Sequence, residues 1–505
     1  MLPPLGSRTR TWKTFLSAAA SWLGAGGGSL KEKTVRGGIW VLLGGAANRL
    51  AGLAKLAVLG RLLSPRDFGL LGVALLVQQW IESFTQTGVQ AALIQKREDI
   101  RLDLDPAWSL QLLRAILVSA LVLLAAPLGG RFFQNTDAIP VVRTVSLLTL
   151  LYGFTNPAVV YLRKELDFRR DVAWRLTGAI AGLAVAIPLA FLLRNAWALV
   201  ISVIVARAGE TLASYLIHPY RPRWQFGWTR IRDLMRFGKW IFWLNVVGFF
   251  SLYIDGLAVG RFLGTTALGY YQVAQQIAVI PLVSASSQLQ GLLFPAFSKL
   301  LRQQDLRRAF VAVLRLSATT VVPLGCFVMV FAQPLVHVML GPKWIGICPI
   351  LPFLAWVGIA RALRGVTGPL VMGIGQPKWL TFGTLLDLLV VATLVYPLLA
   401  GWGTPGVAAA VAAAAAVSLC FQLTITCWLL QIPWRELAGA FQPAAVGSVS
   451  FLLLPLVSAL APPAGVYLPA AAALAVYSIV VLHAAWSQFR PRPSPAPGRE
   501  RQNHD

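Results

Sequence analysis

Gly60-Arg61-Leu62-Leu63 and Gly260-Arg261-Phe262-Leu263 are two copies of one short segment, separated by 200 residues. The flanking sequences match as well, because residues 36–93 align with residues 236–293 without a gap and are identical at 11 of 58 positions. Other identical pairs are Arg36 with Arg236, Trp40 with Trp240 and Gly69 with Gly269. Similarity at a fixed offset indicates an internal repeat. We therefore expect two lobes of similar structure with one cavity between them.

The composition identifies the environment of these lobes. Apolar residues make up 57% of the chain and charged residues only 12%, whereas a soluble domain carries about 25% charged residues. The apolar residues come in blocks of about 20, the length of a helix that crosses a hydrocarbon layer about 30 Å thick. Within lipid, only a helix satisfies the backbone hydrogen bonds of such a continuous run. The sequence therefore predicts an all-α polytopic membrane protein.

Fourteen such blocks are expected to form transmembrane helices, near residues 38–60, 68–94, 107–127, 139–162, 173–193, 195–217, 238–260, 267–297, 309–331, 345–373, 379–400, 405–428, 443–461 and 465–487. The second copy of the repeat begins at the seventh block, so both lobes enter the membrane from the same side and are parallel repeats. The expected organisation is a cytoplasmic N-terminal extension (1–35), an N-lobe of six helices (36–218), a cytoplasmic linker between the lobes (219–237), a C-lobe of six helices (238–430), two extra C-terminal helices (431–489) and a disordered cytoplasmic tail (490–505).

The distribution of basic residues supports this arrangement. Of the 44 lysines and arginines, 29 fall at the termini and in loops on one side of the predicted helices and 6 in loops on the other side. Cytoplasmic loops carry an excess of Lys and Arg, so both termini are expected in the cytoplasm. The net charge of +25 then reflects this orientation and contact with anionic membrane lipids. No nucleic-acid partner is expected.

The sequence lacks the motifs of an enzyme or a metal site. The four cysteines lie in or beside apolar blocks without a C-x-x-C pair, and the four histidines are scattered. No phosphate-binding G-x-x-x-x-G-K-[ST] loop occurs, and the connecting loops are too short for a soluble catalytic domain. We therefore expect no catalytic residue, no metal and no cofactor.

Charged residues inside the predicted helices point to the function. Nine basic residues fall there, but only four acidic ones. A charge near the centre of a bilayer costs about 2.5–3.5 kcal/mol, so each should face a water-filled cavity or a partner. The excess of positive charge predicts an anionic cargo, and an arginine can bind a phosphate group through two donors. The residues expected to bind this cargo are Arg49, Lys55, Arg114, Arg361 and Arg364.

Two acidic residues, Glu82 and Asp255, are candidates for gating or for coupling transport to an ion gradient. Asp255 is the repeat equivalent of Lys55, and the two charges would pair in one state of a transporter if their helices face each other. A third acidic residue, Glu210, follows Arg207 by three positions, so the two can neutralise each other on one helix face.

Polar side chains follow two of the predicted helices, 68–94 and 267–297. Amides that face water can bind sugar hydroxyls, and amides buried between helices can instead join them. The glutamines that we expect to line the cavity, with helix contacts as the alternative, are Gln79, Gln86, Gln275 and Gln290.

The repeated segment also carries a family resemblance. The copy at 60–71 (GRLLSPRDFGLL), the copy at 255–271 (DGLAVGRFLGTTALGYY) and the turn Thr155-Asn156-Pro157 resemble bacterial polysaccharide-unit flippases. These are the polysaccharide transporters of the multidrug/oligosaccharidyl-lipid/polysaccharide exporter superfamily. The likeness spans about residues 34–430.

The resemblance implies a V-shaped pair of six-helix lobes that opens alternately to each side of the bacterial plasma (inner) membrane, with two extra helices. It implies a cargo of oligosaccharide repeat units on a polyprenyl-diphosphate carrier, moved to the external leaflet for exopolysaccharide, capsule or O-antigen assembly. It further implies action beside the polymerase and export proteins of the same pathway. The intramembrane cations suit such a lipid-linked anionic oligosaccharide independently of the resemblance.

Three alternatives stay open at this stage. A cation-coupled multidrug exporter of the same superfamily would favour an acid-rich cavity, and here basic residues outnumber acidic ones. A flippase for the lipid precursor of peptidoglycan would share the number of helices and the basic cavity. The third alternative is a membrane enzyme such as a polymerase or an acyltransferase. The identity of the sugar and of any coupling ion is equally open.

Overall fold

The computed structural model describes residues 30–85, 93, 100–165, 167–227, 248–297 and 303–459, without the side chains of residues 30–39, 42, 287–297, 303 and 449–459. Within these residues every regular element is a helix, which confirms the all-α prediction. The predicted extension up to residue 29, the last predicted helix at 465–487 and the tail at 490–505 lie outside the described residues.

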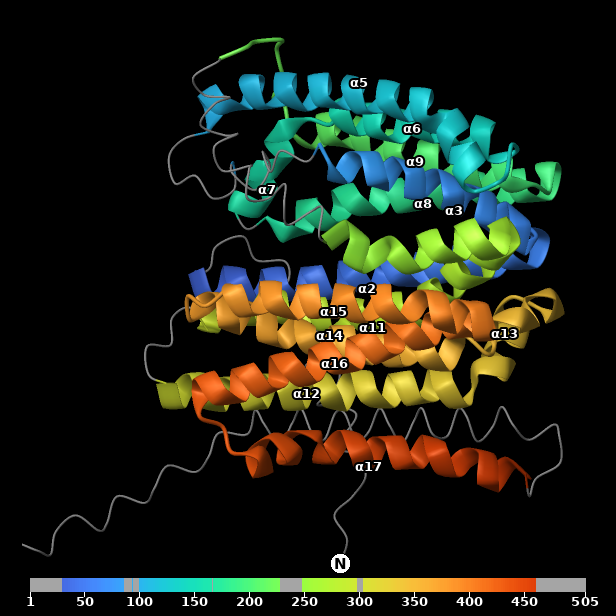
Figure 1. The fold of residues 1–505 in the computed structure, drawn as a ribbon. Helices are drawn as coiled ribbons and strands as arrows, with labels where there is room; N and C mark the ends of the chain where they lie inside the picture. Colours follow the sequence, from blue (N-terminus) through green and yellow to red (C-terminus); the bar gives the residue numbers. More distant parts are fainter. Residues whose placement is uncertain are drawn as a thin grey trace, which may run out of the picture.

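The helices of the N-terminal half form one bundle, with α5, α6, α8 and α9 in the upper part of Figure 1 and α2 at mid-height. α5 packs along α6, α8 packs along α9, and α2 packs on α8. The elements are α2 (Leu30–Leu62), α3 (Pro65–Ser83), α5 (Arg101–Phe132), α6 (Ala138–Gly153), η2 (Pro157–Val159), α7 (Val160–Lys164), α8 (Phe168–Leu193) and α9 (Ala196–Ile217).

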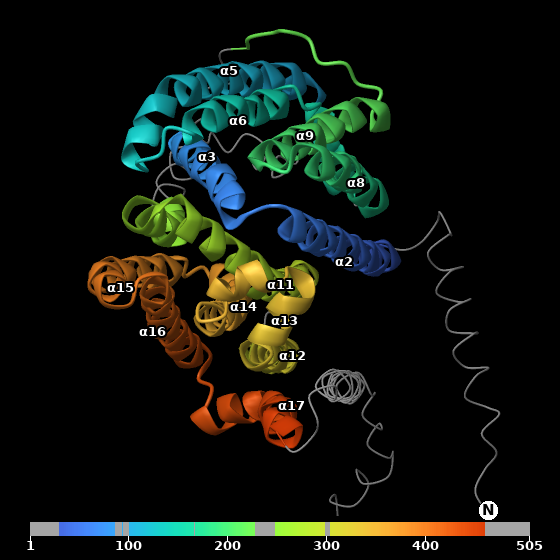
Figure 2. The ribbon, with the colours of Figure 1, turned by 90° about the vertical axis from the view of Figure 1, so that its right-hand side faces the viewer.

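The helices of the C-terminal half form a second bundle below the first (Figures 1 and 2). α11 packs along α14, α15 packs along α16, and α12 contacts α17. A helix at residues 248–258 comes first in this bundle. It is followed by η3 (Val259–Leu263), α11 (Gly264–Phe297), α12 (Gln303–Val330), α13 (Ala332–Met339), η4 (Pro342–Ile347), α14 (Leu351–Gly373), α15 (Lys378–Trp402), α16 (Thr404–Leu430) and α17 (Trp434–Ala459).

The two bundles share an apolar core through α3 and α11. Val73 and Ala74 of α3 belong to the same buried cluster as their repeat equivalents Val273 and Ala274 of α11. In Figure 2 α3 lies at the lower side of the upper bundle and α11 at the upper side of the lower one. The identities at positions 73 and 74 of α3 and 273 and 274 of α11 therefore lie where the two bundles meet.

Local sequence explains where several helices begin and end. Ser64 caps α3, because its side chain accepts a hydrogen bond from the backbone N–H of Asp67 while the Asp67 carboxylate accepts one from the Ser64 N–H. The predicted helix 139–162 is broken instead, because α6 and the segment Pro157–Lys164 meet at an angle of 68°. The Asn156 side chain caps the second segment, and Pro157 supplies its first residue without a backbone donor.

The predicted spans correspond to helices in the structure. Each predicted span up to 443–461 overlaps a helix. Six of the described helices are long and apolar enough to cross a membrane, and a seventh if the bent α6 pair counts as one crossing. Leucines on their outer faces are exposed, such as Leu124 at 75% and Leu216 at 86%. An apolar surface of this kind is what a lipid environment requires.

Candidate functional site

Asp255 forms the centre of a polar cluster in the C-terminal bundle. It is 2% exposed, and its Oδ2 accepts hydrogen bonds from the Tyr271 hydroxyl at 2.8 Å and from the Gln275 amide at 3.0 Å. Arg361 of α14 lies close enough to attract this carboxylate electrostatically. Neutral donors from α11 thus satisfy the hydrogen bonds of the buried acid, and the N–H groups of Arg361 are not used for it.

Arg364, one turn further along α14, forms hydrogen bonds and an ion pair with neighbouring helices. Its Nη1 donates to Oδ1 of Asp387 on α15 at 3.1 Å and to the Ser418 hydroxyl on α16 at 2.8 Å. The other oxygen of Asp387 accepts a hydrogen bond from the Ser251 hydroxyl at 2.9 Å. This ion pair therefore joins α14, α15, α16 and the helix at 248–258. The partners of Arg364 were not predicted from the sequence.

Arg114 is also engaged, in the N-terminal bundle. Its Nε donates to the backbone oxygen of Thr85 at 2.7 Å, and its Nη2 donates to the Thr85 hydroxyl at 3.1 Å and the Glu82 backbone oxygen at 3.4 Å. These acceptors lie at the C-terminal end of α3, where backbone oxygens lack partners within the helix. Arg114 thus caps α3 from α5.

The carboxylate of Glu82 is bound by neutral side chains. Its Oε1 accepts hydrogen bonds from the Thr149 hydroxyl at 2.5 Å and from the Gln78 amide at 3.2 Å. Gln78 also donates to the Thr149 hydroxyl at 2.8 Å and is 7% exposed. Gln78 was not predicted from the sequence. Gln79, which we expect to line the cavity, is half-buried one position further along.

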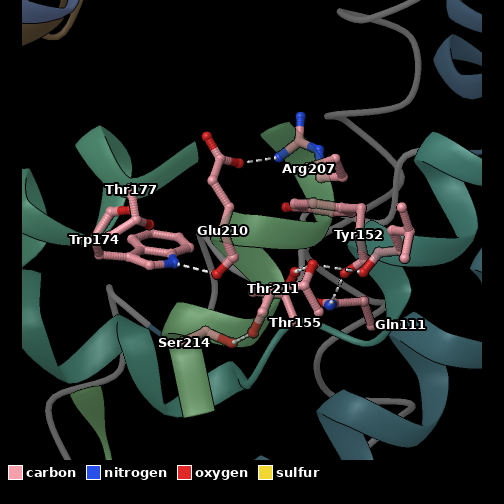
Figure 3. Close-up of polar contacts among 10 residues, drawn as sticks. Gln111, Tyr152, Thr155, Trp174, Thr177, Arg207, Glu210, Thr211 and Ser214 are labelled. Carbon is pink, nitrogen blue, oxygen red and sulfur yellow. Dashed lines mark hydrogen bonds and ion pairs between the residues drawn. The ribbon is translucent and has the colours of Figure 1, made fainter. Parts of the chain in front are cut away.

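Arg207 and Glu210 form the ion pair that their spacing predicts. Arg207 Nη1 donates to Glu210 Oε2 at 2.6 Å, as Figure 3 shows. The guanidinium also lies 5.5 Å from the centroid of the Tyr152 ring, and Trp174 Nε1 donates to the Glu210 backbone oxygen at 2.7 Å. Neutralisation of this pair within the N-terminal bundle is confirmed.

Lys55 and Asp255 do not pair in this conformation. Lys55 Nζ donates to the Ser202 hydroxyl at 2.8 Å, inside the N-terminal bundle. Asp255 is satisfied inside the C-terminal bundle by Tyr271 and Gln275. The two equivalent charges are therefore each held within their own lobe.

Arg49 differs from the other predicted cations because it is exposed. Residues 46–50 of α2 are all exposed, so one full turn of this helix is uncovered by the described protein. Neither Arg49 nor Arg361 forms a hydrogen bond or ion pair with any described residue. Of the predicted glutamines, Gln275 contacts Asp255, while Gln86 and the side chain of Gln290 lie outside the described residues.

The segment that follows α9 is attached to the N-terminal bundle. The Tyr220 hydroxyl donates to Asp105 of α5, and the Asn156 amide donates to the Tyr220 backbone oxygen at 2.8 Å. Burial and the contact with Asp105 raise the pKa of Tyr220. His218 Nδ1 accepts the Tyr220 backbone N–H at 3.2 Å, and burial lowers the pKa of His218. Both effects favour the neutral side chains.

Metal ligands do not gather in the described part of the chain. Within it, no group of three or more His, Cys, Asp or Glu side chains could hold a metal ion. The cysteines there are free thiols: Cys326, Cys348, Cys420 and Cys427.

Comparison with known proteins identifies the family. Residues 58–349, more than half of the chain, match the family described as polysaccharide biosynthesis protein. The chain belongs to this family. It is 27% identical over 347 residues to the lipopolysaccharide biosynthesis protein WzxC of Escherichia coli (strain K12), covering 68% of this chain and 70% of that protein. It is also 27% identical over 332 residues to the succinoglycan biosynthesis transport protein ExoT of Rhizobium meliloti (strain 1021), covering 65% and 67%.

A solved membrane protein shares the fold of this polysaccharide biosynthesis family member. The structure described as the lipid II flippase MurJ in an inward closed conformation superposes with a TM-score of 0.71 at 12% identity. The match covers 90% of this chain and 99% of that one. The family match itself includes Glu82, Arg114 and Asp255, whereas Arg49 and Arg361 lie outside it.

Proposed function

We propose that this protein is a flippase that moves polyprenyl-diphosphate-linked oligosaccharide units across the bacterial inner membrane by alternating access, as a transporter without catalytic residues. The units would serve exopolysaccharide, capsule or O-antigen assembly. The observation that carries the proposal is the pair Arg49 and Arg361, whose guanidinium groups form no hydrogen bond or ion pair with a described residue.

The depth of these two arginines suits a diphosphate in transit. Arg361 lies ten residues after the start of α14 at Leu351, and Arg49 lies thirteen residues before the end of α2 at Leu62. At 1.5 Å per residue the two depths are about 15 and 20 Å from the same end of the bundle. The hydrocarbon core is about 30 Å thick, so both groups lie near its middle.

The remaining cations of the predicted set support the same cargo indirectly. Lys55, Arg114 and Arg364 each donate to protein acceptors. They contribute positive charge near the path, and direct binding is assigned to Arg49 and Arg361. Asp255 offsets part of the charge of Arg361, but a charged group at this depth also needs partners for its donors, and water and an anion can supply them to both arginines.

The names of the relatives support a role in glycan assembly. One relative carries the name of a lipopolysaccharide biosynthesis protein, another that of a succinoglycan transport protein, and the structural neighbour that of a lipid II flippase. The orientation with both termini in the cytoplasm, the lobes 36–218 and 238–430, and cooperation with a polymerase and export proteins belong to the same proposal.

A cation-coupled drug exporter fits the structure less well. A cationic drug needs an available carboxylate, but the four intramembrane acids already accept hydrogen bonds from protein groups. Glu82 is held by Thr149, and Glu210 by Arg207. Asp255 is held by Tyr271, and Asp387 by Arg364, Ser251 and Ser418.

The proposal is tested by transport in reconstituted liposomes. The substrate is a polyprenyl-diphosphate oligosaccharide, and translocation is measured by enzymatic accessibility of the sugar on the far side. Because hydrogen bonds to charged groups contribute about 1.5–3 kcal/mol, Arg361→Gln should slow transport roughly tenfold or more. Arg143→Gln, which alters an exposed arginine of α6, serves as the matched control and should transport at the wild-type rate.

Two outcomes would contradict the proposal. One is equal transport by wild type and Arg361→Gln at equal amounts of folded protein, which would remove the role of the arginine. The other is wild-type failure with several lipid-linked glycans together with export of a cationic dye, which would favour the drug exporter.

A further inference from the structure

The two lobes meet most tightly at the end of the bundle where α3 and α11 begin, which faces the viewer in Figure 2. A Cβ atom on Gly69 would lie 1.8 Å from the backbone oxygen of Thr265, and one on Gly269 would lie 1.8 Å from the backbone oxygen of Pro65. Both distances are about half of a normal contact between non-bonded atoms. Backbone therefore packs on backbone here, and only glycine allows it.

These two contacts are reciprocal. Positions 65 and 69 of the first repeat are equivalent to positions 265 and 269 of the second, at the offset of 200 residues. Each glycine thus packs against the same backbone position of the other repeat. A pseudo-twofold axis passes between α3 and α11 at this point.

The glycines of the Gly-Arg segments also cross between the lobes. A Cβ atom on Gly60 would lie 2.5 Å from the Leu340 side chain of the C-terminal bundle. One on Gly260 would lie 2.7 Å from the Phe133 ring of the N-terminal bundle. Both glycines therefore let a large apolar side chain of the opposite lobe approach the backbone.

The arginines that follow these glycines reach across in both directions. Arg61 donates to the backbone oxygen of Val338 in the C-terminal bundle. Arg261 lies over the Phe132 ring of the N-terminal bundle, 5.6 Å from its centroid, a cation–π contact. Arg61 therefore contacts the opposite lobe through a hydrogen bond, and Arg261 through a cation–π contact.

Three further hydrogen bonds join the lobes at this end. Trp344 Nε1 donates to the Gly60 backbone oxygen at 2.7 Å, and Lys343 Nζ donates to the Arg61 backbone oxygen at 2.8 Å. The Asn135 amide donates to the Thr265 hydroxyl at 2.8 Å. Each crosses from one bundle to the other, so separating the lobes here breaks all of them.

Further from this end the lobes meet through side chains, because a Cβ atom on Gly72 would lie 2.3 Å from the Gln272 side chain. At Gly256, a Cβ atom would lie 3.6 Å from the side chain of Leu76, an ordinary van der Waals distance. Leu76 lies seven residues beyond Gly69 on α3, which is about 10 Å along the helix. Backbone thus packs on backbone at this end, whereas side chains fill the contact between the lobes further in.

We propose that this set of contacts is the gate that closes one end of the transport path. We name it the Gly-Arg clasp and define it as Gly60, Arg61 and Gly69 with their equivalents Gly260, Arg261 and Gly269. The gate is closed in this structure, and it opens when α3 and α11 separate about the pseudo-twofold axis. By the distribution of loop charges this end faces outward, so the closed clasp is an inward-facing or occluded state. The inference concerns the lobes alone and holds for any cargo.

The distance between the lobes at this end tests the gate directly. The four cysteines are replaced by alanine, and spin labels are placed at Thr136 and Ile345, which are exposed on opposite lobes. Pulsed electron paramagnetic resonance then gives the populations of short and long distances in lipid nanodiscs. Gly269→Ala places its Cβ against backbone, and overpacking of this kind should raise the ratio of long to short distances roughly tenfold. The control is Gly52→Ala, whose Cβ meets nothing within 4 Å, and it should leave the ratio unchanged.

A milder variant keeps the test decisive if Gly269→Ala does not fold. Trp344→Phe replaces the indole by a smaller phenyl ring, so it removes the donor to the Gly60 backbone oxygen and part of the packing of this buried side chain. It should raise the same ratio several-fold or more, as the loss of one hydrogen bond and of buried contacts predicts. A distance distribution identical to wild type in every folded variant of the two would overturn the proposal. So would an equal shift in Gly52→Ala. Neither outcome bears on the cargo, because the readout contains none.

Discussion

The two lobes keep the same backbone contacts and carry opposite charges at equivalent positions. Position 55 is a lysine in the N-terminal bundle, and position 255 is an aspartate in the C-terminal bundle. The lysine is half-buried and donates to Ser202, whereas the aspartate is buried and accepts from Tyr271 and Gln275. The glycines of the clasp, in contrast, are the same in both lobes.

This difference separates two tasks of the repeated fold. Closure of the lobes depends on backbone approach, which only glycine permits, so both copies need it. In the proposed function, anion binding depends on guanidinium groups without a hydrogen-bond partner in the described protein, and each lobe supplies one, Arg49 in the N-terminal bundle and Arg361 in the C-terminal bundle. In the N-terminal bundle Arg114 donates to the Thr85 backbone oxygen, and Arg207 donates to the Glu210 carboxylate. In the C-terminal bundle Arg361 keeps its N–H groups available beside Asp255.

The largest expected effect lies in the ion pair of Arg364 and Asp387. Their side chains are 16% and 7% exposed, so Asp387→Leu leaves a guanidinium buried without its counter-charge, and this should cost about 3–5 kcal/mol. The double variant Arg364→Met with Asp387→Leu should recover most of the loss. Denaturant unfolding in detergent, followed by intrinsic fluorescence, measures both.

The corresponding change in the N-terminal bundle is the matched control. Arg207 and Glu210 are 39% and 27% exposed, and Glu210 lies seven residues, about 10 Å, from the end of α9 at Ile217. After Arg207→Met the carboxylate is therefore less enclosed by protein than Arg364 is, and the loss should be smaller, about 1–2 kcal/mol. Equal losses from Asp387→Leu and Arg207→Met would show that the two lobes do not differ in this respect.

A second, smaller effect separates the equivalent positions 55 and 255. Asp255→Asn keeps the side-chain size and removes the charge that attracts Arg361, so the arginine should bind an anion more tightly, by roughly threefold to tenfold. Lys55→Gln changes the equivalent residue of the other lobe and should not strengthen binding. Calorimetry with a soluble polyprenyl-diphosphate analogue measures the affinity. Unchanged affinity in Asp255→Asn would show that Asp255 and Arg361 do not compete with the cargo.

Sequence alone predicted the parts of this structure that depend on local pattern. The apolar blocks placed the helices, because block length is set by membrane thickness. The spacing of Arg207 and Glu210 predicted their ion pair, since three residues form nearly one helical turn. The repeat predicted two lobes. The repeat did not show that Gly69 packs against the second copy and Gly269 against the first, because two identical residues in an alignment need not be in contact.

The site was harder to predict, because its partners are distant in the chain. The contact of Lys55 with Ser202 joins two helices that the sequence does not relate. The buried Gln78 was not predicted, because one residue turns a helix face by about 100° and the neighbouring Gln79 is equally polar. In a helix with so few polar residues, packing of α6 against α3 decides which amide is buried.

The smallest effect concerns the segments that leave the two lobes. His218 accepts the Tyr220 backbone N–H and stacks on Tyr161, with Glu165, Arg170 and Arg221 as its charged neighbours. Its pKa is lowered by burial, so its contribution is present above the unfolded-state pKa and is lost as pH falls through the lower folded-state value. Tyr220 stays protonated across this range, because its own pKa is raised.

A spin label at Arg223→Cys, in the chain with the other cysteines replaced, should become about twofold more mobile between pH 8 and pH 5, the range in which histidine gains its proton. The segment that follows α16 is held differently, because Arg307 of α12 pairs with Glu436 in the first turn of α17. A label at Arg435→Cys should therefore change little over the same range. His218→Asn should abolish the pH dependence at position 223, since asparagine does not titrate. If the pH dependence at position 223 persists in His218→Asn, another group releases the segment. His218 would then not explain why the segments at positions 223 and 435 differ.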